Sequence, residues 1–350
     1  MSEGKATVGI IANPMSGRDV RRLAARASTT TPEIKRDQVA RAAVGAVAAG
    51  AERLIVLQEP FRIATAAVEY LGLAAEIEVL SIGHELSGRA TERAAVAMRE
   101  AGAGALIVLG GDGTNRCVAR AWPDVALMPL STGTNNVFPL HVEATVGGAA
   151  AGLVAAGRVD RDAVAPPVKL VRVQIDGEPD DLALIDAILL EGDSTGNLMP
   201  FDPARMRELV LSRAEPASVG NSPIGGLLHP CRAEDDFGVF VECAPHGGGG
   251  RPLLAPISPG LFKPVHVKAS RPLPLGEPIK VERPGVLAFD GDRERVLAPG
   301  QSATLTVERN GPRVIDVDAA LLAAAQAGVF LDRHHWQDTK NDATGGFDCC

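Results

Sequence analysis

Aromatic residues and paired cysteines are scarce in this 350-residue chain. Aromatics make up 3% of the residues and charged residues 22%, whereas hydrophobic residues reach 46%. Such a composition is too apolar for a disordered chain, and Ala, Val, Leu and Ile must build most of the core. The five cysteines include no C-x-x-C pair, so neither a disulfide framework nor a zinc site is expected, and a reducing compartment is indicated.

Excess basic charge and long apolar runs are also lacking. The chain has 35 Lys and Arg against 43 Asp and Glu, for a net charge of -8, whereas a nucleic-acid-binding protein is usually basic. No apolar run approaches the ~20 residues needed to cross a bilayer, and the N-terminus lacks the pattern of a signal peptide. We therefore expect a cytoplasmic protein with no nucleic-acid or membrane partner.

The first half of the chain alternates strand-like and helix-like segments, and the length predicts two domains. Near-continuous apolar strands are predicted at 7–12, 53–57, 76–81, 105–109 and 125–130, and helices at 34–49, 63–71, 91–101 and 142–156. This alternation is typical of a doubly wound parallel α/β domain, here residues 1–160. Ligands bind such sheets beyond the carboxyl ends of the strands, so the loops after Ala12, Leu109 and Leu130 are the candidates.

The second half changes to short strands separated by Gly, Pro and Asp. We predict them at 169–175, 182–190, 238–242, 265–268, 279–282, 286–289, 303–307 and 313–317. Regular short strands with turns between them favour a β-sandwich, here residues 161–317. A helix over 318–331 and a loose polar tail over 332–350 are expected to follow.

The strongest motif is Gly110-Gly111-Asp112-Gly113-Thr114, directly after a buried strand. Three glycines let the backbone approach a ligand and adopt positive φ, and the amides with a helix N-terminus behind them can hold phosphate oxygens. Asp112 at the end of the strand can then accept a proton or reach a metal ion. The alternative is a tight strand-to-helix turn with Asp or Thr as a helix cap.

A second polar loop follows the strand that ends at Leu130. Its hydroxyl, amide and backbone donors suit phosphate and ribose oxygens, although a polar surface loop would look the same in isolation. Next to the first loop on one sheet edge, the ligand-binding interpretation is favoured. The candidate residues are Thr132, Gly133, Thr134, Asn135 and Asn136.

The loop after the first strand contains Asn13, Pro14, Ser16 and Gly17, followed by Arg18, Arg21 and Arg22. The arginines either face phosphates or form the solvated first turn of a helix. The loop is not a Walker A motif because the G-K-[ST] ending is missing, and no G-x-G-x-x-G follows the first strand. An ordinary dinucleotide-binding dehydrogenase is therefore disfavoured.

Asp290-Gly291-Asp292 stands between two predicted strands. On local grounds this sequence indicates a type I′ hairpin turn, because Asp-Gly tolerates positive φ at both central positions.

Residues 110–114 match the GGDGT box of the superfamily that contains NAD kinases, diacylglycerol and sphingosine kinases, and phosphofructokinases. The first loop resembles the N-P-x-[SA]-G element of that superfamily, and residues 132–136 resemble the G-T-x-N segment of its lipid kinases. Asp186 stands where NAD kinases carry an acidic residue, and Asp290-Gly291 resembles a late Asp-Gly of both branches. The combination is most similar to the acetoin-catabolism protein X group, which resembles ATP–NAD kinases.

The resemblance implies an α/β domain and a β-sandwich with the site between them, with ATP and Mg²⁺ as cofactors. Asp112 would orient or deprotonate the accepting hydroxyl, and Asp186 and Asp290 would bind the substrate. The implied nucleotide contacts are Asn13, Ser16, Gly17, Gly110, Gly111, Gly113, Thr114, Asn115, Thr132, Gly133, Thr134, Asn135 and Asn136. A homo-oligomer, either a dimer or a tetramer, is the expected assembly, and the metal ligands stay unassigned.

The acceptor stays open between three alternatives. The first is NAD, phosphorylated at the adenosine ribose 2′-hydroxyl to give NADP. The second is another hydroxyl compound, such as a small polyol or a lipid, and the third is a non-catalytic nucleotide-binding accessory protein. Ile185, Asn221 and Pro223 depart from the NAD kinase pattern where the acceptor would lie, as do Asn115 and Arg116 after the box.

Overall fold

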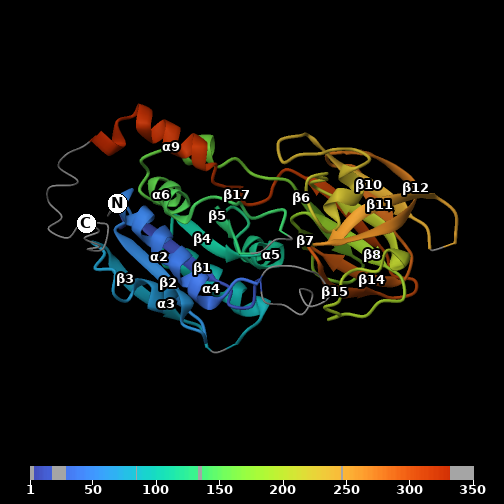
Figure 1. Ribbon diagram of the computed structural model, residues 1–350, viewed down its shortest axis with the longest axis horizontal. Helices are drawn as coiled ribbons and strands as arrows, with labels where there is room; N and C mark the ends of the chain where they lie inside the picture. Colours follow the sequence, from blue (N-terminus) through green and yellow to red (C-terminus); the bar gives the residue numbers. More distant parts are fainter. Residues whose placement is uncertain (1–3, 18–28, 84, 133–135, 246, 332–350) are drawn as a thin grey trace.

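The computed structural model describes residues 4–17, 29–83, 85–132, 136–245 and 247–331. They form two lobes joined side by side (Figure 1). One lobe has a sheet between layers of helices, and the other consists mainly of antiparallel strands.

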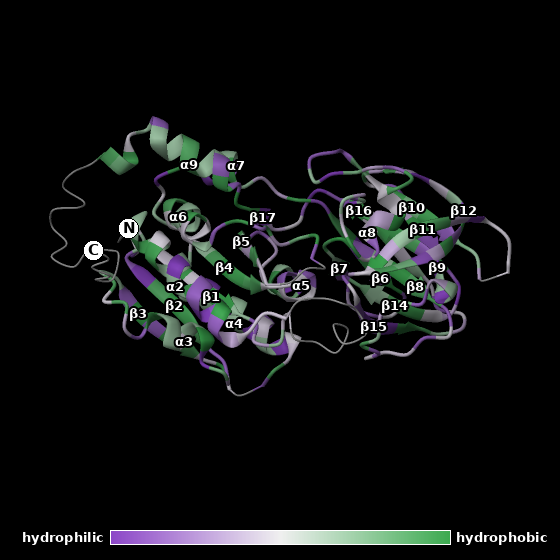
Figure 2. Cartoon of the chain, viewed as in Figure 1, coloured by the Kyte–Doolittle hydropathy of each residue, from purple (hydrophilic) through white to green (hydrophobic). Residues whose placement is uncertain are grey.

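The first lobe is built on a six-stranded parallel sheet with the order β17-β5-β4-β1-β2-β3. Its main strands are β1 (Thr7–Ala12), β2 (Arg53–Gln58), β3 (Glu76–Ser81), β4 (Ala105–Gly110) and β5 (Ala126–Ser131). β1 and β4 are buried along their whole length, and β2 and β4 are drawn mainly in the apolar colour (Figure 2). The strand order reverses between β1 and β4, so the loops after these two strands flank the point where open α/β sheets bind ligands.

Helices cover both faces of this sheet and bury one apolar cluster on each side. They are α2 (Pro32–Ala48), α3 (Ile63–Val68), α4 (Gly88–Glu100), α5 (Asp112–Ala121), α6 (Ala144–Ala155) and the short α7 (Arg161–Val164). The contact of α2 with α6 is very close, because a Cβ on Gly148 would lie 2.0 Å from the carbonyl oxygen of Ala42. The predicted doubly wound α/β fold is confirmed.

The second lobe has two antiparallel sheets, one of seven strands (β11-β12-β10-β9-β8-β14-β15) and one of four (β13-β16-β6-β7). Apolar side chains of both sheets form one shared core, which confirms the predicted sandwich. In chain order the strands and short helices are β6 (Leu170–Ile175), β7 (Asp181–Ala183), β8 (Asp186–Leu190), a 3₁₀ turn (Pro203–Arg205), β9 (Met206–Leu211), α8 (Ser222–Gly226), β10 (Phe237–Cys243), β11 (Arg251–Ser258), β12 (Leu261–Pro274), β13 (Pro278–Val281), β14 (Gly285–Phe289), β15 (Asp292–Leu297) and β16 (Ala303–Glu308).

The chain returns to the first lobe after β16. The strand predicted at 313–317 is only two residues long, β17 (Arg313–Val314), and it pairs in parallel with β5 rather than within the sandwich. The assignment of this strand to the sandwich was wrong. Ile315 and one face of the following α9 (Val317–Gln326), with Val317, Ala320 and Ala324, are instead buried in the core of the first lobe.

The predicted terminal helix over 318–331 is split. α9 ends at Gln326, Gly328 adopts a φ of +71°, and a 3₁₀ turn follows at Val329–Leu331. The tail predicted over 332–350 lies outside the described residues. Within the described part of the chain, none of the helices combines the length and the apolar character needed to cross a membrane.

Candidate active site

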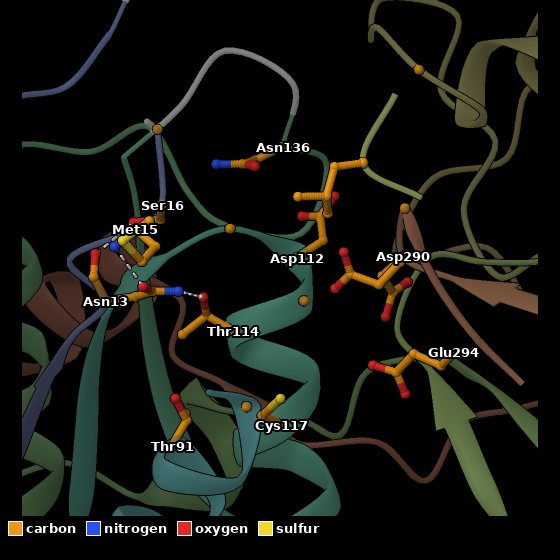
Figure 3. A pocket seen from close by; sticks show the side chains of 18 of the residues that line it. Asn13, Met15, Ser16, Thr91, Asp112, Thr114, Cys117, Asn136, Asp290 and Glu294 are labelled. Atoms are coloured by element: carbon orange, nitrogen blue, oxygen red, sulfur yellow. Dashed lines mark hydrogen bonds between the residues drawn. The ribbon is translucent and has the colours of Figure 1, made fainter. Parts of the chain in front are cut away.

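A cavity of about 790 Å³ opens where the two lobes meet, beyond the ends of β1 and β4. Its wall combines loops of the first lobe with the starts of β8 and β15 and with loops of the second lobe. In Figure 3, Asn13, Ser16 and Thr114 lie on one side of this space, and Asp290 and Glu294 lie on the other. The sequence-predicted residues that line it are Asn13, Ser16, Gly17, Gly111, Asp112, Gly113, Thr114, Asn136, Asp186 and Asp290.

Asp112 is the first residue of α5, but its carboxylate does not cap that helix. Gly111 is the N-cap residue and offers no side chain, while Asp112 turns to a different segment. Its Oδ1 accepts the backbone N–H of Phe138 at 2.9 Å and that of Val137 at 3.2 Å. The alternative interpretation, in which the side chain of Asp112 or Thr114 caps the helix, is therefore wrong.

The pKa of Asp112 lies near neutrality. Burial, followed by the negative charge of Asp290, raises the pKa of Asp112 to about 7, although the two N–H donors and the charge of Arg213 oppose this shift. A carboxyl group with a pKa near neutrality can both take and release a proton under ordinary conditions.

The motif glycines allow neighbouring side chains to pack directly against the start of α5, and they are not needed for positive φ. Gly110, Gly111 and Gly113 do not adopt positive φ, which corrects our expectation from the sequence. A Cβ on Gly111 would lie 2.9 Å from Asn136 Oδ1, and one on Gly113 would lie 2.5 Å from Asp292 Oδ2. The absence of side chains here lets both neighbouring walls touch the start of α5.

Asp290 confirms the hairpin turn that the local sequence predicts, and the carboxylate expected to bind substrate holds backbone N–H groups beside the cavity. Asp290 and Gly291 have φ values of 50° and 88° at the β14–β15 hairpin, as a type I′ turn requires. The buried Asp290 carboxylate also accepts the N–H groups of Leu184 and Ile185 at 2.8 and 2.7 Å. These bonds hold the chain where it passes from one sheet to the other, and for this reason the strand predicted at 182–190 is divided into β7 and β8.

Asp186 begins β8 and is the third carboxylate of the cluster. Its Oδ1 accepts the side-chain N–H of Asn221 at 3.2 Å. Burial, then the charges of Asp290 and Asp112, raises the pKa of Asp186 well above its usual range. The fold thus brings together Asp112, Asp186 and Asp290, which are far apart in the sequence.

The loops after β1, β4 and β5 are joined by side-chain hydrogen bonds. Asn13 donates to Thr114 Oγ1 at 2.8 Å, and Thr132 donates from Oγ1 to Ser16 Oγ at 2.8 Å. Gly17 has a φ of +71° and packs against the carbonyl oxygen of Thr132. Three predicted loops therefore form one polar surface.

Some predicted nucleotide contacts are placed behind that surface. Asn115 is fully buried and donates to the carbonyl oxygen of Gly111 at 2.9 Å, because it occupies the inner face of α5. It therefore does not line the cavity, and neither do Gly110 and Thr132, although Thr132 supports the loop. Gly133, Thr134 and Asn135 lie outside the described residues.

Comparisons with known proteins identify the family. Residues 169–310 match the model of the acetoin catabolism protein X C-terminal domain. The chain is 35% identical over 349 residues to acetoin catabolism protein X of Cupriavidus necator, covering 94% of this chain and 93% of that protein. The chain belongs to the acetoin catabolism protein X family.

Two solved structures from Bacillus anthracis also align with this member of the acetoin catabolism protein X family. One is described as a diacylglycerol kinase, with 13% identity, coverage of 90% of this chain and 98% of the other, and a TM-score of 0.43. The second is described as a putative diacylglycerol kinase, with 13% identity, coverage of 89% and 97%, and a TM-score of 0.47.

In this member of the acetoin catabolism protein X family, sequence reasoning missed the function of Arg116. Its side chain is 1% exposed, donates to Glu294 Oε2 at 2.9 Å, and has Nε 3.5 Å from Asp290 Oδ2. Burial would raise the pKa of Glu294, but the hydrogen bond and charge of Arg116, aided by Arg120, lower it to about 2. Arg116 thus joins α5 to the β14–β15 hairpin. The run of charges in Asp292–Leu297 was the available signal.

A second missed residue in this family member is Lys35, which is fully buried below the first loop. Its ammonium group donates to the carbonyl oxygens of Asn13, Pro14 and Ser16 at 2.7, 3.0 and 2.6 Å. Lys35 belongs to α2 and therefore fixes the loop shape from beneath. A lysine inside a predicted helix carried no signal for this role.

Proposed function

We propose that this protein is an ATP-dependent phosphotransferase that uses a hydroxyl group as acceptor and Asp112 as general base. The observation that carries the proposal is a carboxyl group with a pKa of about 7 at the N-terminus of a ten-residue helix, beside the reversal of strand order. Phosphoryl transfer depends mainly on positioning and charge neutralisation, and the fixed carboxylate and the start of α5 support the first of these and part of the second.

The first-lobe wall suits the phosphates of the donor. Asn13, Ser16 and Thr114 present hydroxyl and amide groups to the cavity, and the start of α5 adds the positive end of a helix dipole. Side chains that are already hydrogen-bonded to one another hold these donors in place. We therefore assign ATP to this wall.

A magnesium ion fits this proposal through the phosphates rather than through a protein cage. Mg²⁺ commonly uses one or two carboxylates together with substrate phosphates and water. No group of three or more ligating side chains suited to a metal occurs among the described residues. Asp292, whose side chain is 37% exposed and lies against Gly113, is the carboxylate that would hold the ion. The ion would neutralise phosphate charge when bound.

On the acceptor side, the hydroxyl would lie between Asp112 and the Asp186–Asn221 pair. Asp112 takes the hydroxyl proton, the oxygen forms a bond to the γ-phosphorus, and the bond from that phosphorus to the bridging oxygen of ADP breaks. NAD is the acceptor that we propose to test first, with NADP as the product.

A small uncharged polyol is the second candidate acceptor, and one observation favours it. Seven carboxylate side chains and no Lys or Arg line the cavity among the residues that the structure describes. Such a wall favours a neutral hydroxyl compound over an anionic one.

The first experiment incubates the protein with ATP, Mg²⁺ and NAD and detects NADP with an NADP-specific dehydrogenase. Asp112→Asn serves as the matched control because it keeps the shape of the side chain and removes the base. NADP that forms with the wild type and not with the variant supports the full proposal. Phosphorylation of a polyol panel without NADP supports the second acceptor, and no transfer to either class refutes the kinase.

A further inference from the structure

Large apolar side chains that remain exposed line part of the cavity. Met15 and Leu86 of the first lobe are 45% and 48% exposed, and Leu198 and Met199 of the second lobe are 48% and 51% exposed. Leaving side chains of this size in water gives up free energy that burial would supply. An exposed apolar surface with a polar rim is typical of a ligand-binding site. The polar groups assigned above to the donor and to the base do not use this surface.

The second-lobe part of this surface is continuous along the chain. Leu198, Met199, Pro200 and Phe201 all line the cavity, and we call this run the apolar shelf. It lies in the connection between β8 and β9. A run of consecutive apolar residues that stays partly exposed to water indicates a function, because folded proteins otherwise avoid such runs on their surface.

Arg293 holds the apolar shelf in a fixed shape. Its side chain is 1% exposed, pairs with Asp193 at 2.9 Å, and donates to the carbonyl oxygens of Asn197 and Met199 at 2.8 and 2.9 Å. Its guanidinium carbon also lies 4.3 Å from the centre of the Phe201 ring. A surface whose backbone is fixed before a ligand arrives loses little conformational entropy on binding. The apolar shelf is therefore a preorganised binding surface.

Arg293 also places the apolar shelf beside the carboxylates of the second lobe. It follows Asp292 directly in β15, and its carbonyl oxygen accepts the N–H of Gly196 at 3.1 Å. Asp292 in turn lies against Gly113, the residue after Asp112, because a Cβ on Gly113 would lie 2.5 Å from Asp292 Oδ2. The apolar shelf therefore borders the side of the cavity that we assign to the acceptor.

The lining and the size of the cavity limit what the apolar shelf can receive. Carboxylates of both lobes line the cavity, and no Lys or Arg does so among the described residues, so an anionic group would be repelled. The volume of about 790 Å³ is that of a pocket for one ligand of ordinary size, and a bound nucleotide would take much of it. The room that is left suits an apolar group of a few carbon atoms and not a long chain.

We propose that the acceptor is an uncharged alcohol with a short apolar group, and that this group lies on the apolar shelf while the hydroxyl faces Asp112. The proposal rests on the phosphotransferase function given above and specifies the chemical class of its second candidate acceptor. Leu198 and Met199 are then specificity-determining residues, because they contact the part of the acceptor that does not react. Each methylene group that they cover leaves water and strengthens binding.

The kinetic test uses a series of terminal vicinal diols with straight chains of three, four, six and eight carbon atoms. The release of ADP from ATP in the presence of Mg²⁺ measures each rate. We expect kcat/KM to rise by about threefold for each added methylene group up to the six-carbon diol. The eight-carbon diol should bring no further rise, because its chain extends beyond the apolar shelf.

Two variants remove apolar surface from the shelf and leave the backbone bonds of Arg293 in place. Leu198→Ser and Met199→Ser should each lower kcat/KM for the six-carbon diol by about tenfold, and for the three-carbon diol by less than about twofold. The matched control is Leu322→Ser in α9, because this leucine is 60% exposed and does not line the cavity. The control should leave the rates of the whole series unchanged.

A binding test needs no phosphoryl transfer and uses the uncharged fluorescent probe N-phenyl-1-naphthylamine. The fluorescence of this probe rises in apolar surroundings. We expect the wild type to bind it, the affinity to fall by about tenfold in Leu198→Ser, and the affinity to stay unchanged in Leu322→Ser. The six-carbon diol should displace the probe, whereas ADP should not, because we assign ADP to the first-lobe wall.

Several results would overturn the inference and leave the kinase intact. They are diol rates that do not depend on chain length, equal effects of Leu198→Ser and Leu322→Ser, and transfer to NAD or to long-chain lipid vesicles with none to the diols. Displacement of the probe by ADP also overturns it, because the apolar shelf would then hold the base of the nucleotide. A wild type that transfers no phosphoryl group to any acceptor refutes the proposed function itself, and the probe then tests the apolar shelf independently.

Discussion

The two walls of the cavity differ in chemistry. The first-lobe wall presents hydroxyl and amide groups on the loops after β1 and β4, together with the carboxylates Glu59, Glu85 and Asp112. The second-lobe wall presents Asp186, Asp290, Asp292 and Glu294 on antiparallel strands and a hairpin. Helix and loop amides suit an anion, whereas carboxylates suit a hydroxyl proton or a cation. Under the proposed function, the first lobe would hold the phosphoryl donor and the second lobe the acceptor.

The largest expected effect comes from the residue at which the walls meet. Asp112→Asn should lower kcat by about 10²- to 10⁴-fold, because a general base contributes that much. ADP affinity should stay near the wild-type value, since the amide keeps the size of the carboxylate. Steady-state kinetics and calorimetry measure the two quantities. A variant with kcat within a few-fold of the wild type would show that another group takes the proton.

The next variant removes the buried cation that connects α5 of the first lobe to the β14–β15 hairpin of the second. Arg116→Met leaves Glu294 and Asp290 without their buried cation and should lower the free energy of unfolding by about 3–5 kcal/mol. Denaturant unfolding measures the change. The control is Arg172→Met, which breaks the exposed pair with Asp180, with side chains 45% and 51% exposed. That change should cost less than about 1 kcal/mol. Equal effects would show that Arg116 does not join the lobes.

The pH dependence of kcat/KM tests the charge of the shared cluster. With Asp112 ionised as the proposed base, kcat/KM should rise about tenfold per pH unit below a pKa of about 7 and level off above it. Asp290 and Asp186 face Asp112 with negative charge and Arg213 with positive charge, so Asp290→Asn should move this limb to lower pH. If the acidic limb of the pH profile does not move in that variant, the measured pKa belongs to a group other than Asp112.

Ionisation of Asp112 should lower the stability of the folded protein, whereas it should raise kcat/KM. The pKa of Asp112 is raised in the folded state, so its contribution is complete below the unfolded value of 3.8 and is lost as the pH rises toward about 7. The melting temperature of the wild type relative to Asp112→Asn should therefore fall between about pH 4 and pH 7. A constant difference over this range would contradict the raised pKa.

The smallest expected effects come from a crossed pair of variants, one on each wall. Asn13→Ala removes a donor to Thr114 and should weaken nucleotide binding by about fivefold, the effect of one hydrogen bond. Asn221→Ala removes the donor to Asp186 and should raise the KM of the acceptor by about the same factor. Each variant should leave the other substrate unaffected. If either variant changes both the nucleotide affinity and the acceptor KM, the two walls do not bind the two substrates separately.

Much of this arrangement could be predicted from local patterns. The apolar runs at Thr7–Ala12 and Ala105–Gly110 predict buried parallel strands, and the glycine-rich motif after the second of them predicts a ligand loop. Asp290-Gly291 predicts a type I′ turn, which the φ values confirm. β9 and β15 were missed because they carry arginines and glutamates on strands that are only partly apolar.

The sequence alone determined the identity of the loops, the turn at Asp290 and the candidate base Asp112, because strand period, glycine spacing and turn chemistry act over a few residues. Tertiary structure decided which sheet receives β17, how Asp290 binds the β7–β8 link, and that the buried Arg116 pairs with Glu294. It also decided the pKa of Asp112, since burial and the charges of Asp290 and Arg213 depend on segments about a hundred residues or more away. Electrostatic interactions follow distance in space, and only the folded chain sets those distances.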